Sequence, residues 1–377
     1  MRLLILLISL ILSAILTPFA GKLHAEPLSA NLIRVAIVKG VSNVSIDGDG
    51  LLALPANDTA LLLQPPVLVS NRSGKLLLNG KQYQSLRISA PDKTNINGKN
   101  YRGVLELVPQ GNSILVINEL PLEHYLIGVI NSEISSTWPM EVIKVQAVIA
   151  RTYAVAKRQE RHNALFHLES TVMDQAYDGS DLEDSRAAKG VHDTEGQVLT
   201  YKGDVIQAFY HANSGGKTEA SQNVWGMSLP YLQGVDDRYG LNAASSRWEQ
   251  TLQLSRIASS LGAAGYNTGR ILDIKAGSHN NRDRLSSVIL RTNRGNISIP
   301  ATKFRMAVGS TIIKSTNFTV NTNGNTAYFK GRGYGHGVGL CQWGSRQRAL
   351  DGFKYTEILS YYYPGTRLSN LSGLQVH

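Results

Sequence analysis

Glu133 is the carboxylate whose position in the sequence best suits acid–base chemistry. Five apolar residues before it repeat at helical spacing and predict one buried stripe: Leu122, Tyr125, Leu126, Val129 and Ile130. Glu133 takes the next position on that stripe. Because burial disfavours a charged carboxylate, we expect its pKa to be raised, as a proton donor working near neutral pH requires.

Arg151 is the second charged residue in an apolar setting. It lies within residues 140–157, which are apolar nearly all round and predict a central buried helix. A buried guanidinium needs an anionic partner or ligand. Two interpretations remain open: Arg151 binds an anionic ligand, or it forms an ion pair with Glu133 that ties two helices together.

Residues 210–219 leave an apolar strand and enter a loop that contains Gly215 and Gly216. A nucleotide-binding Walker A motif needs a glycine where His211 stands, so that motif is excluded. A polar loop that contacts a sugar is the functional interpretation, and a plain turn is the structural alternative.

Residues 331–344 carry glycine at every second position from 331 to 339, a pattern that permits close approach of another backbone or a ligand. His336, Gln342 and Trp343 add a titratable ring, an amide and a stacking surface, which suit carbohydrate binding. The alternative is a tightly packed pair of strands with a hydrogen-bonded histidine.

Cys341 is the only cysteine, so no internal disulfide can form. It lies five residues from His336, and in a strand the two side chains would project to opposite faces. A buried thiol is therefore favoured over a nucleophile with a histidine base. The candidate metal ligands His162, His167, Glu169 and Asp174 lack clustered spacing, and we expect no metal and no other cofactor.

The elements that must position these residues predict an α+β fold, with mixed strands around a central helical hairpin and strand-rich N-terminal and C-terminal parts. Strands are expected at residues 32–38, 61–69, 75–78, 101–109, 114–116, 205–211, 271–274, 285–291 and 326–329. Hairpin turns are expected at 97–98 and 110–112, and helices at 121–133, 140–157, 252–264 and 355–362. The hydroxyls of residues 135–137 should cap the second helix.

The beginning of the chain has the form of a secretory signal over residues 1–25: a cationic start, an apolar run over residues 3–16, and a small residue at Ala25. Cleavage after Ala20 and an uncleaved anchor are the alternatives. The net charge is +10, or +8 once Arg2 and Lys22 are removed, which suits an anionic partner. In a cell envelope we expect that partner to be wall polymer or phospholipid in preference to nucleic acid. We expect an exported protein of the periplasm or cell wall, with no membrane span after signal removal.

Several segments together resemble the SpoIID/LytB family of stage II sporulation protein D. They follow one another in the family's order, at residues 120–126, 131–133, 138–139, 144–154, 174–177, 213–216 and 333–339. The resemblance covers about residues 100–368. We expect a SpoIID-like domain over residues 101–368, after a strand-rich region at 26–100 and before a tail at 369–377.

The resemblance implies a peptidoglycan lytic transglycosylase that acts on glycan strands stripped of stem peptides. Glu133 would protonate the oxygen between N-acetylmuramic acid and N-acetylglucosamine, and the sugar's own primary hydroxyl would close an anhydro ring without a second carboxylate. Substrate-binding roles are expected for Arg151, Tyr177, Tyr210, His211, Ser214, His336 and Gln342.

The same resemblance leaves a second function open, because some proteins with this domain are described as enhancers of an amidase. The chain would then be a non-catalytic wall-binding protein that enhances an N-acetylmuramoyl-L-alanine amidase. The expected partners are glycan strands and a wall amidase or other remodelling proteins. Some family members hold zinc through histidine and cysteine before the Asp-Gln-x-Tyr motif, but residues 167–177 contain no cysteine.

Overall fold

The first sheet joins strands from both sides of residue 100. In a computed structural model that describes residues 31–55, 59–171, 174–243 and 246–374, its order is β13-β1-β12-β11-β8-β3-β4. These strands are β1 (Leu32–Val41), β3 (Leu52–Pro55), β4 (Leu61–Leu62), β8 (Leu86–Ser89), β11 (Val104–Gln110), β12 (Ser113–Pro121) and β13 (Leu168–Glu169). The expected signal segment, residues 1–25, lies outside the described residues. The sheet includes strands from both sides of the domain boundary predicted at residue 100, because β8 pairs with β11 and β1 pairs with β12.

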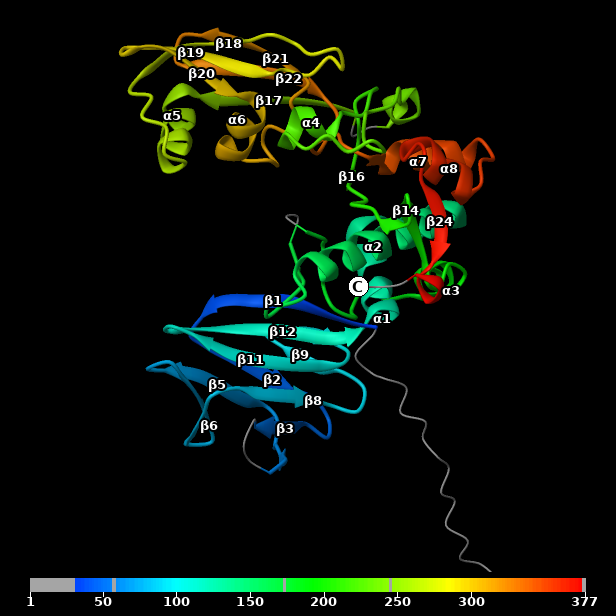
Figure 1. Ribbon diagram of the computed structural model, residues 1–377. Helices are drawn as coiled ribbons and strands as arrows, with labels where there is room; N and C mark the ends of the chain where they lie inside the picture. Colours follow the sequence, from blue (N-terminus) through cyan, green and yellow to red (C-terminus); the bar gives the residue numbers. More distant parts are fainter. Residues whose placement is uncertain (1–30, 56–58, 172–173, 244–245, 375–377) are drawn as a thin grey trace, which may run out of the picture. The chain divides into compact units, whose positions relative to one another are not determined.

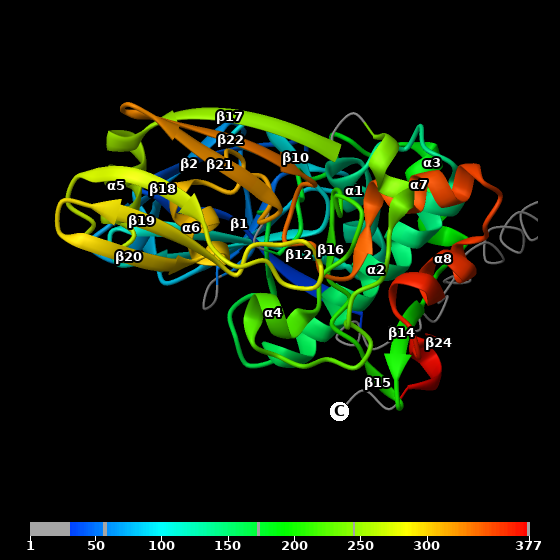
Figure 2. The same cartoon turned by 90° about the horizontal axis from the view of Figure 1, so that it is seen from above.

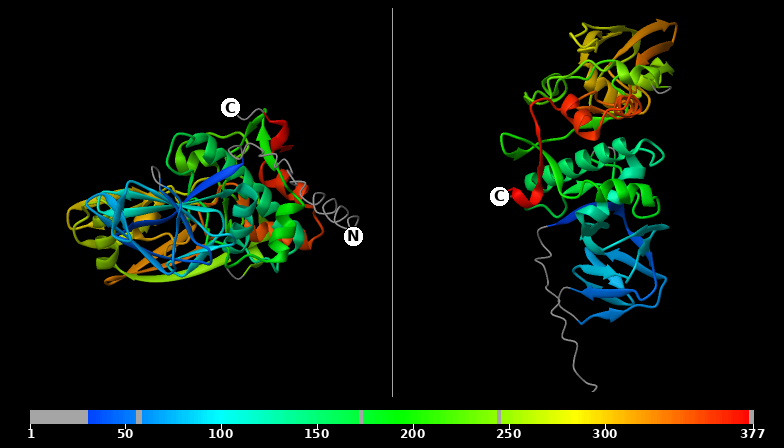
Figure 3. Two further views of the ribbon diagram at one scale, coloured as in Figure 1. Left: turned by 90° about the horizontal axis from the view of Figure 1, so that it is seen from below. Right: turned by 90° about the vertical axis from the view of Figure 1, so that its right-hand side faces the viewer.

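A second sheet has the order β10-β9-β2-β5-β6-β7. Its strands are β2 (Asn43–Asp47), β5 (Val67–Arg72), β6 (Lys75–Leu78), β7 (Lys81–Tyr83), β9 (Thr94–Ile96) and β10 (Lys99–Tyr101). Both predicted hairpin turns are confirmed. Asn97 and Gly98 have positive φ between β9 and β10, and β11 pairs with β12 around residues 111–112. The strands of residues 32–121, blue to cyan, gather together in Figure 3.

The predicted helical hairpin is confirmed as α1 (Leu122–Glu133) and α2 (Met140–Glu160). The five stripe residues of α1 are all buried, and Glu133 is its last residue. The expected capping of α2 is wrong, because the residue before it is Pro139 and no side chain caps the helix. The Ser136 hydroxyl bonds to Asp184 instead, and those of Ser135 and Thr137 bond to each other.

Helix α2 is buried on two faces, which explains why its sequence is apolar nearly all round. Ile143, Ala147 and Ala150 pack into a core shared with α1 and the first two sheets. Val145, Val148 and Ile149 pack into a second core formed mainly by later parts of the chain. Helix α2 therefore joins the N-terminal strands to the C-terminal elements, as Figure 1 shows.

Short elements follow at residues 185–225 and 340–370. They are α3 (Ser185–His192), β14 (Gln197–Tyr201), β15 (Asp204–Val205), β16 (Tyr210–His211), α4 (Ser221–Trp225), β23 (Leu340–Cys341), α7 (Gln342–Leu350), α8 (Tyr355–Tyr362) and β24 (Arg367–Asn370). Helix α3 packs into the first core through Ala187 and Val191, whereas β16, β23, α7 and α8 pack into the second core. The predicted helix at 355–362 is confirmed as α8. The predicted strand at 205–211 is wrong in its middle, because residues 206–209 lie between β15 and β16 without strand pairing.

Residues 247–332 form a third core of their own. Sheet β17-β22-β21 and sheet β18-β19-β20 pack with α5 and α6. The bounds are β17 (Arg247–Gln253), α5 (Leu254–Ala263), β18 (Ile271–Ala276), β19 (Ser287–Thr292), β20 (Gly295–Pro300), α6 (Ala301–Val308), β21 (Phe318–Asn323) and β22 (Thr326–Arg332). Figure 2 shows β17, β22 and β21 side by side.

The whole arrangement is α+β, as predicted. Among the helices of the described residues, none is long and apolar enough to span a membrane.

Candidate active site around Glu133

Glu133 lies at the C-terminal end of α1 and is only partly exposed. The apolar stripe of α1 faces the core, and Glu133 continues that stripe at the end of the helix. Its carboxyl therefore lies at the boundary between the interior and the surface. The C-terminal end of a helix carries partial negative charge, which disfavours a carboxylate there. Position and burial therefore act in the same direction and favour the neutral acid.

Three groups hydrogen-bond to the Glu133 carboxyl. The backbone N–H of Ala176 donates to Oε1 at 2.7 Å, and the side chains of Tyr210 and Gln342 bond to the same carboxyl. Burial raises the pKa of Glu133 to about 7, although each of these hydrogen bonds lowers it. Among the described residues, no cation is one of the groups that shift this pKa. The carboxyl thus has the expected property of a donor working near neutral pH.

A chain of side-chain hydrogen bonds orients the Tyr210 hydroxyl toward Glu133. The Tyr125 hydroxyl donates to Gln175 Oε1 at 3.1 Å, and Gln175 Nε2 donates to the Tyr210 oxygen at 3.1 Å. The Tyr210 oxygen therefore accepts from Gln175, and its own proton is free to point at Glu133. Gln175 also directs Nε2 at the carbonyl of Ala150 in α2, so the chain is anchored to both helices of the hairpin.

Gln342, the first residue of α7, is distant from Glu133 in the sequence but bonds to its carboxyl. Its Nε2 also donates to Gln146 Oε1 on α2 at 3.3 Å. Gln342 follows Cys341, whose strand β23 pairs in parallel with β16, so Tyr210 lies opposite Leu340 and His211 opposite Cys341. That pairing brings two distant segments, residues 210–211 and 340–342, to the same carboxyl.

The alternating glycines make this pairing possible. A Cβ on Gly339 would lie 2.0 Å from the carbonyl oxygen of Phe209, and one on Gly335 would lie 2.6 Å from the Cβ of His211. Both glycines also have positive φ. The predicted close backbone approach is therefore confirmed.

His336 lies on this loop and is partly exposed. Its Nδ1 accepts from the N–H of Val338 at 3.1 Å, and burial lowers its pKa to about 3. Its ring centroid is 5.0 Å from that of Trp225, whose side chain is 40% exposed. His336 is thus a neutral ring beside an exposed indole, which is a surface suited to a sugar face.

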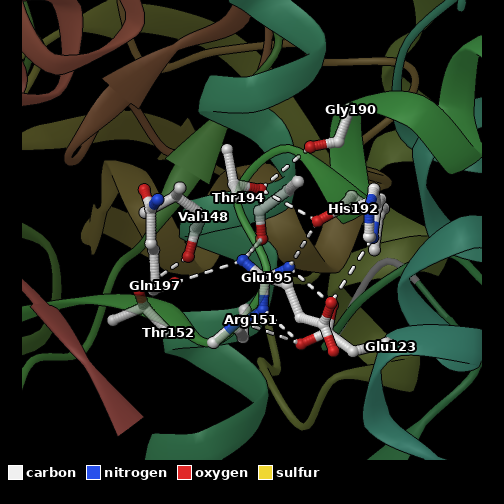
Figure 4. A network of polar contacts seen from close by, with 12 residues as sticks. Glu123, Val148, Arg151, Thr152, Gly190, His192, Thr194, Glu195 and Gln197 are labelled. Atoms are coloured by element: carbon white, nitrogen blue, oxygen red, sulfur yellow. Dashed lines mark hydrogen bonds and ion pairs between the residues drawn. The ribbon is translucent and has the colours of Figure 1, made fainter.

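Arg151 does not pair with Glu133, so the predicted ion pair between them is wrong. Its side chain is fully buried and binds both carboxylate oxygens of Glu123 in the first turn of α1. Its other donors reach the carbonyls of Ala147, Val191 and Gln197. Figure 4 shows Arg151 between Glu123 and Gln197. Because these donors bond to protein acceptors, we interpret Arg151 as a structural residue that links α1 to α2.

Three further predicted site residues are buried and bonded to protein groups. The Tyr177 hydroxyl donates to Asn118 at 2.9 Å, and the Ser214 hydroxyl donates to Asp237 at 2.7 Å. His211 contacts the Val338 carbonyl through Nδ1 at 3.1 Å, and burial holds its pKa well below the usual range. These side chains support the loops that carry Ala176, Tyr210 and Gln342. We therefore treat them as supports and not as groups that face a substrate.

The thiol of Cys341 is buried, as predicted. It accepts hydrogen bonds from the N–H groups of Ser214 and Gly344, and burial raises its pKa. Of the candidate metal ligands, His167 accepts from the N–H of Arg34, and Asp174 pairs with Arg161. Over the residues that the structure describes, no three histidine, cysteine or acidic side chains gather closely enough to hold a metal ion.

Three contributors to the site were not assigned a role from the sequence: the Ala176 N–H, Gln175 and Gln146. A backbone donor leaves no sequence signal. Gln146 does, because it is a polar residue inside an otherwise apolar buried stretch. Gln175 belongs to the 174–177 motif, but only the fold shows that it links Tyr125 to Tyr210.

Comparison of the sequence with known proteins identifies the family of this chain. A family model described as Stage II sporulation protein matches residues 110–201, which include α1, α2 and residues 174–177. A second model, described as a domain of unknown function, matches residues 232–339 and covers the third core. The chain belongs to the SpoIID family.

Relatives from two bacteria extend the match along the chain. An uncharacterized protein of Brachyspira hyodysenteriae is 32% identical over 81% of this chain and 83% of its own length. The amidase enhancer of Bacillus subtilis is 31% identical over 79% of this chain, which spans about half (49%) of that protein. Stage II sporulation protein D of Bacillus subtilis is 27% identical over 67% of this chain and 76% of its own length.

Proposed function

We propose that this protein is a peptidoglycan lytic transglycosylase that cleaves peptide-stripped glycan strands, with Glu133 as its acid. One observation carries the proposal: a partly exposed carboxyl whose pKa is raised to about 7, held by Ala176, Tyr210 and Gln342. Membership of the SpoIID family supports a role at the cell wall.

The chemistry proposed for Glu133 has two steps. The protonated carboxyl donates its proton to the oxygen that joins N-acetylmuramic acid to N-acetylglucosamine, and the bond from the muramyl C1 to that oxygen breaks. The carboxylate then takes the proton of the muramyl primary hydroxyl, whose oxygen bonds to C1 and closes the anhydro ring. Glu133 ends protonated, and no water is consumed. This differs from ordinary glycosidases, which use two carboxylates.

Each neighbour of Glu133 serves one of these steps. The N–H of Ala176 fixes Oε1, so the other carboxyl oxygen is the one that carries the exchanged proton. Tyr210 and Gln342 stabilise the carboxylate formed after proton donation, and this keeps the pKa near 7 instead of higher. The exposed indole of Trp225 beside His336 offers a surface for a neighbouring sugar.

Product analysis tests the proposal. The protein is incubated with wall treated with an amidase and with untreated wall, and the released sugars are examined by mass spectrometry. We expect anhydro-muramyl ends from the amidase-treated wall, and none from Glu133→Gln. The matched control is Glu249→Gln, because the Glu249 side chain is 73% exposed and lies on β17, outside the site. Absence of anhydro ends with the wild-type protein would refute the activity, and a fully active Glu133→Gln would refute the acid.

A second candidate function follows from a relative whose name is amidase enhancer. The chain would then bind wall and raise the rate of an N-acetylmuramoyl-L-alanine amidase without cutting glycan. Amidase rates on intact wall, measured with the wild-type protein and with Glu133→Gln, separate the two. Equal stimulation by both proteins, without anhydro products, would favour the enhancer.

We also propose export to the periplasm or cell wall, where both candidate functions require the protein to act. The support is the pattern of residues 1–25 and the similarity to an amidase enhancer and to stage II sporulation protein D. Size and N-terminal sequence of the protein recovered outside the cytoplasm would test the cleavage predicted after Ala25.

A further inference from the structure

Arg346 on α7 is a cation that stacks on two tryptophans. Its guanidinium carbon lies 5.7 Å from the ring centroid of Trp138 and 5.5 Å from that of Trp343. The two indoles themselves pack with centroids 4.9 Å apart. All three residues are partly exposed, so the group forms part of the surface.

The donors of Arg346 have no acceptor among the described residues. Its Nε is buried without a hydrogen-bond partner, and Arg346 takes part in no ion pair between the described residues. Stacking uses the faces of a guanidinium, and with Nε buried the two Nη groups are the donors left available to a ligand. Their N–H groups have the spacing that binds a carboxylate through two parallel hydrogen bonds.

Two segments of the chain connect Trp138, Trp343 and Arg346 to the proposed acid. Gln342, which bonds to Glu133, is four residues before Arg346 on α7, so both side chains lie on one face of that helix. Trp138 follows Glu133 by five residues, in the short connection between α1 and α2. The group is thus connected to the position of Glu133 both through α7 and through the segment between α1 and α2.

We propose that Trp138, Trp343 and Arg346 form a subsite for a sugar that bears a carboxylate. Resting on the proposed function, we identify this carboxylate as the lactyl group of N-acetylmuramic acid. In intact wall that group is joined to the stem peptide as a neutral amide. Removal of the peptide by an amidase converts it to a free anion. Arg346 thus gives the site a physical means of preferring peptide-stripped strands.

Binding measurements test this subsite without requiring turnover. The protein carrying Glu133→Gln, which leaves the glycan intact, is titrated with amidase-treated glycan strands and with the same strands after their carboxylates are converted to methylamides. We expect about tenfold weaker binding to the methylamide strands, in line with the loss of one charge-assisted pair. Adding Arg346→Gln should weaken binding to the native strands to the same level and remove the discrimination.

Two further variants keep the result interpretable. Arg346→Lys retains the charge but not the paired edge donors, so we expect it to discriminate between the two strands less than arginine does. Arg256→Gln removes an exposed arginine on α5 and should preserve the full discrimination. Tryptophan fluorescence and circular dichroism would show that each variant is folded.

The outcomes separate this inference from the proposed function. Equal binding of both glycans by the Glu133→Gln protein, or full discrimination retained after Arg346→Gln, would overturn the subsite while leaving glycan binding intact. Failure to bind either glycan would overturn the subsite and the glycan-cleaving function together. Preferential binding of a phosphate-bearing wall polymer, lost in Arg346→Gln, would also overturn the carboxylate subsite.

Discussion

Arg151 binds both carboxylate oxygens of Glu123, with Nε 2.8 Å from Oε1 and Nη2 2.6 Å from Oε2 (Figure 4). Glu123 is in the first turn of α1 and Glu133 is its last residue, so about 15 Å of helix separates them. The pair joins the start of α1 to the middle of α2. It can affect Glu133 only through the position of the helix.

Replacing Arg151 by methionine should therefore reduce stability before it affects substrate binding. We expect the free energy of unfolding to fall by about 3–5 kcal/mol, because Glu123 would lose its partner and several buried carbonyls would lose donors. Denaturant unfolding measures this loss. Lys157→Met is the control, since its pair with Glu160 is at the surface and should contribute less than about 1 kcal/mol. Unchanged stability with weakened glycan binding would instead show that Arg151 contacts the substrate.

The pKa of Glu133 predicts the pH dependence of cleavage. The carboxyl must be protonated to donate, and its pKa is raised to about 7, so the donating fraction falls as the pH rises above that value. We expect kcat/KM on peptide-stripped glycan to decline about tenfold per pH unit above roughly pH 7.5. An initial-rate profile from pH 5 to pH 9 measures this. A rate that stays constant up to pH 9 would contradict Glu133 as the acid.

Tyr210 should set the position of that alkaline limb. Its hydrogen bond favours the charged form of Glu133 and lowers the pKa, so Tyr210→Phe should move the limb to higher pH, by up to about one unit. The maximal rate should fall as well, because the carboxylate formed in the reaction loses a donor. Tyr83→Phe, far along the chain on β7, should leave the profile unchanged. A fall in rate without a shift of the limb would mean that Tyr210 contacts only the sugar.

Gly128 allows the Ala176 segment to approach α1. A Cβ at Gly128 would lie 2.5 Å from the carbonyl oxygen of Gly179 and 2.7 Å from the Tyr177 ring. Gly128→Ala should therefore destabilise the protein by about 1–3 kcal/mol, although alanine favours helix. Gly262→Ala in α5 is the matched control. Its Cβ would meet nothing within 4 Å, and we expect it to stabilise the protein by up to about 1 kcal/mol.

The features that local periodicity encodes were predictable from the sequence. The stripe from Leu122 to Ile130 predicted both the buried face of α1 and the raised pKa of Glu133, because a helix fixes which residues share a face. The turn at Asn97 and Gly98 was predictable because few residues adopt its backbone conformation. The nearly complete apolar pattern of residues 140–157 likewise predicted that α2 is buried, although not that it lies between two cores.

Features that depend on distant pairing were not predictable. Arg151 has carboxylates at Glu123 and Glu133 within one helix, and only the packing of α1 on α2 decides between them. Residues 206–209 are apolar enough for a strand, but only a single backbone hydrogen bond at each end joins them to Leu199 and Leu340, so no continuous strand pairing forms. The third core also escaped prediction, because its strands in residues 247–332 resemble the other short strands locally and differ only in what they pack against.

Stability measured against pH tests Glu133 independently of any activity. Its pKa is about 7 in the folded protein and about 4.5 in the unfolded chain, so the folded state holds a proton that the unfolded state releases between these values. The favourable contribution of that proton is complete below about pH 4.5 and is lost as the pH rises through 7. A glutamine at position 133 cannot ionise, so the stability of that variant does not fall in this way as the pH rises.

The free energy of unfolding of Glu133→Gln minus that of the wild type should therefore rise between pH 4.5 and pH 8.5. We expect this rise to be about 1–3 kcal/mol. Denaturant unfolding at several pH values between 4.5 and 8.5 measures the difference. Glu249→Gln, at a largely exposed side chain, is the control for the substitution itself. A difference between Glu133→Gln and wild type that is the same at every pH would mean that the Glu133 carboxyl is already charged at pH 5. The proposed acid would then lack the proton that glycan cleavage requires.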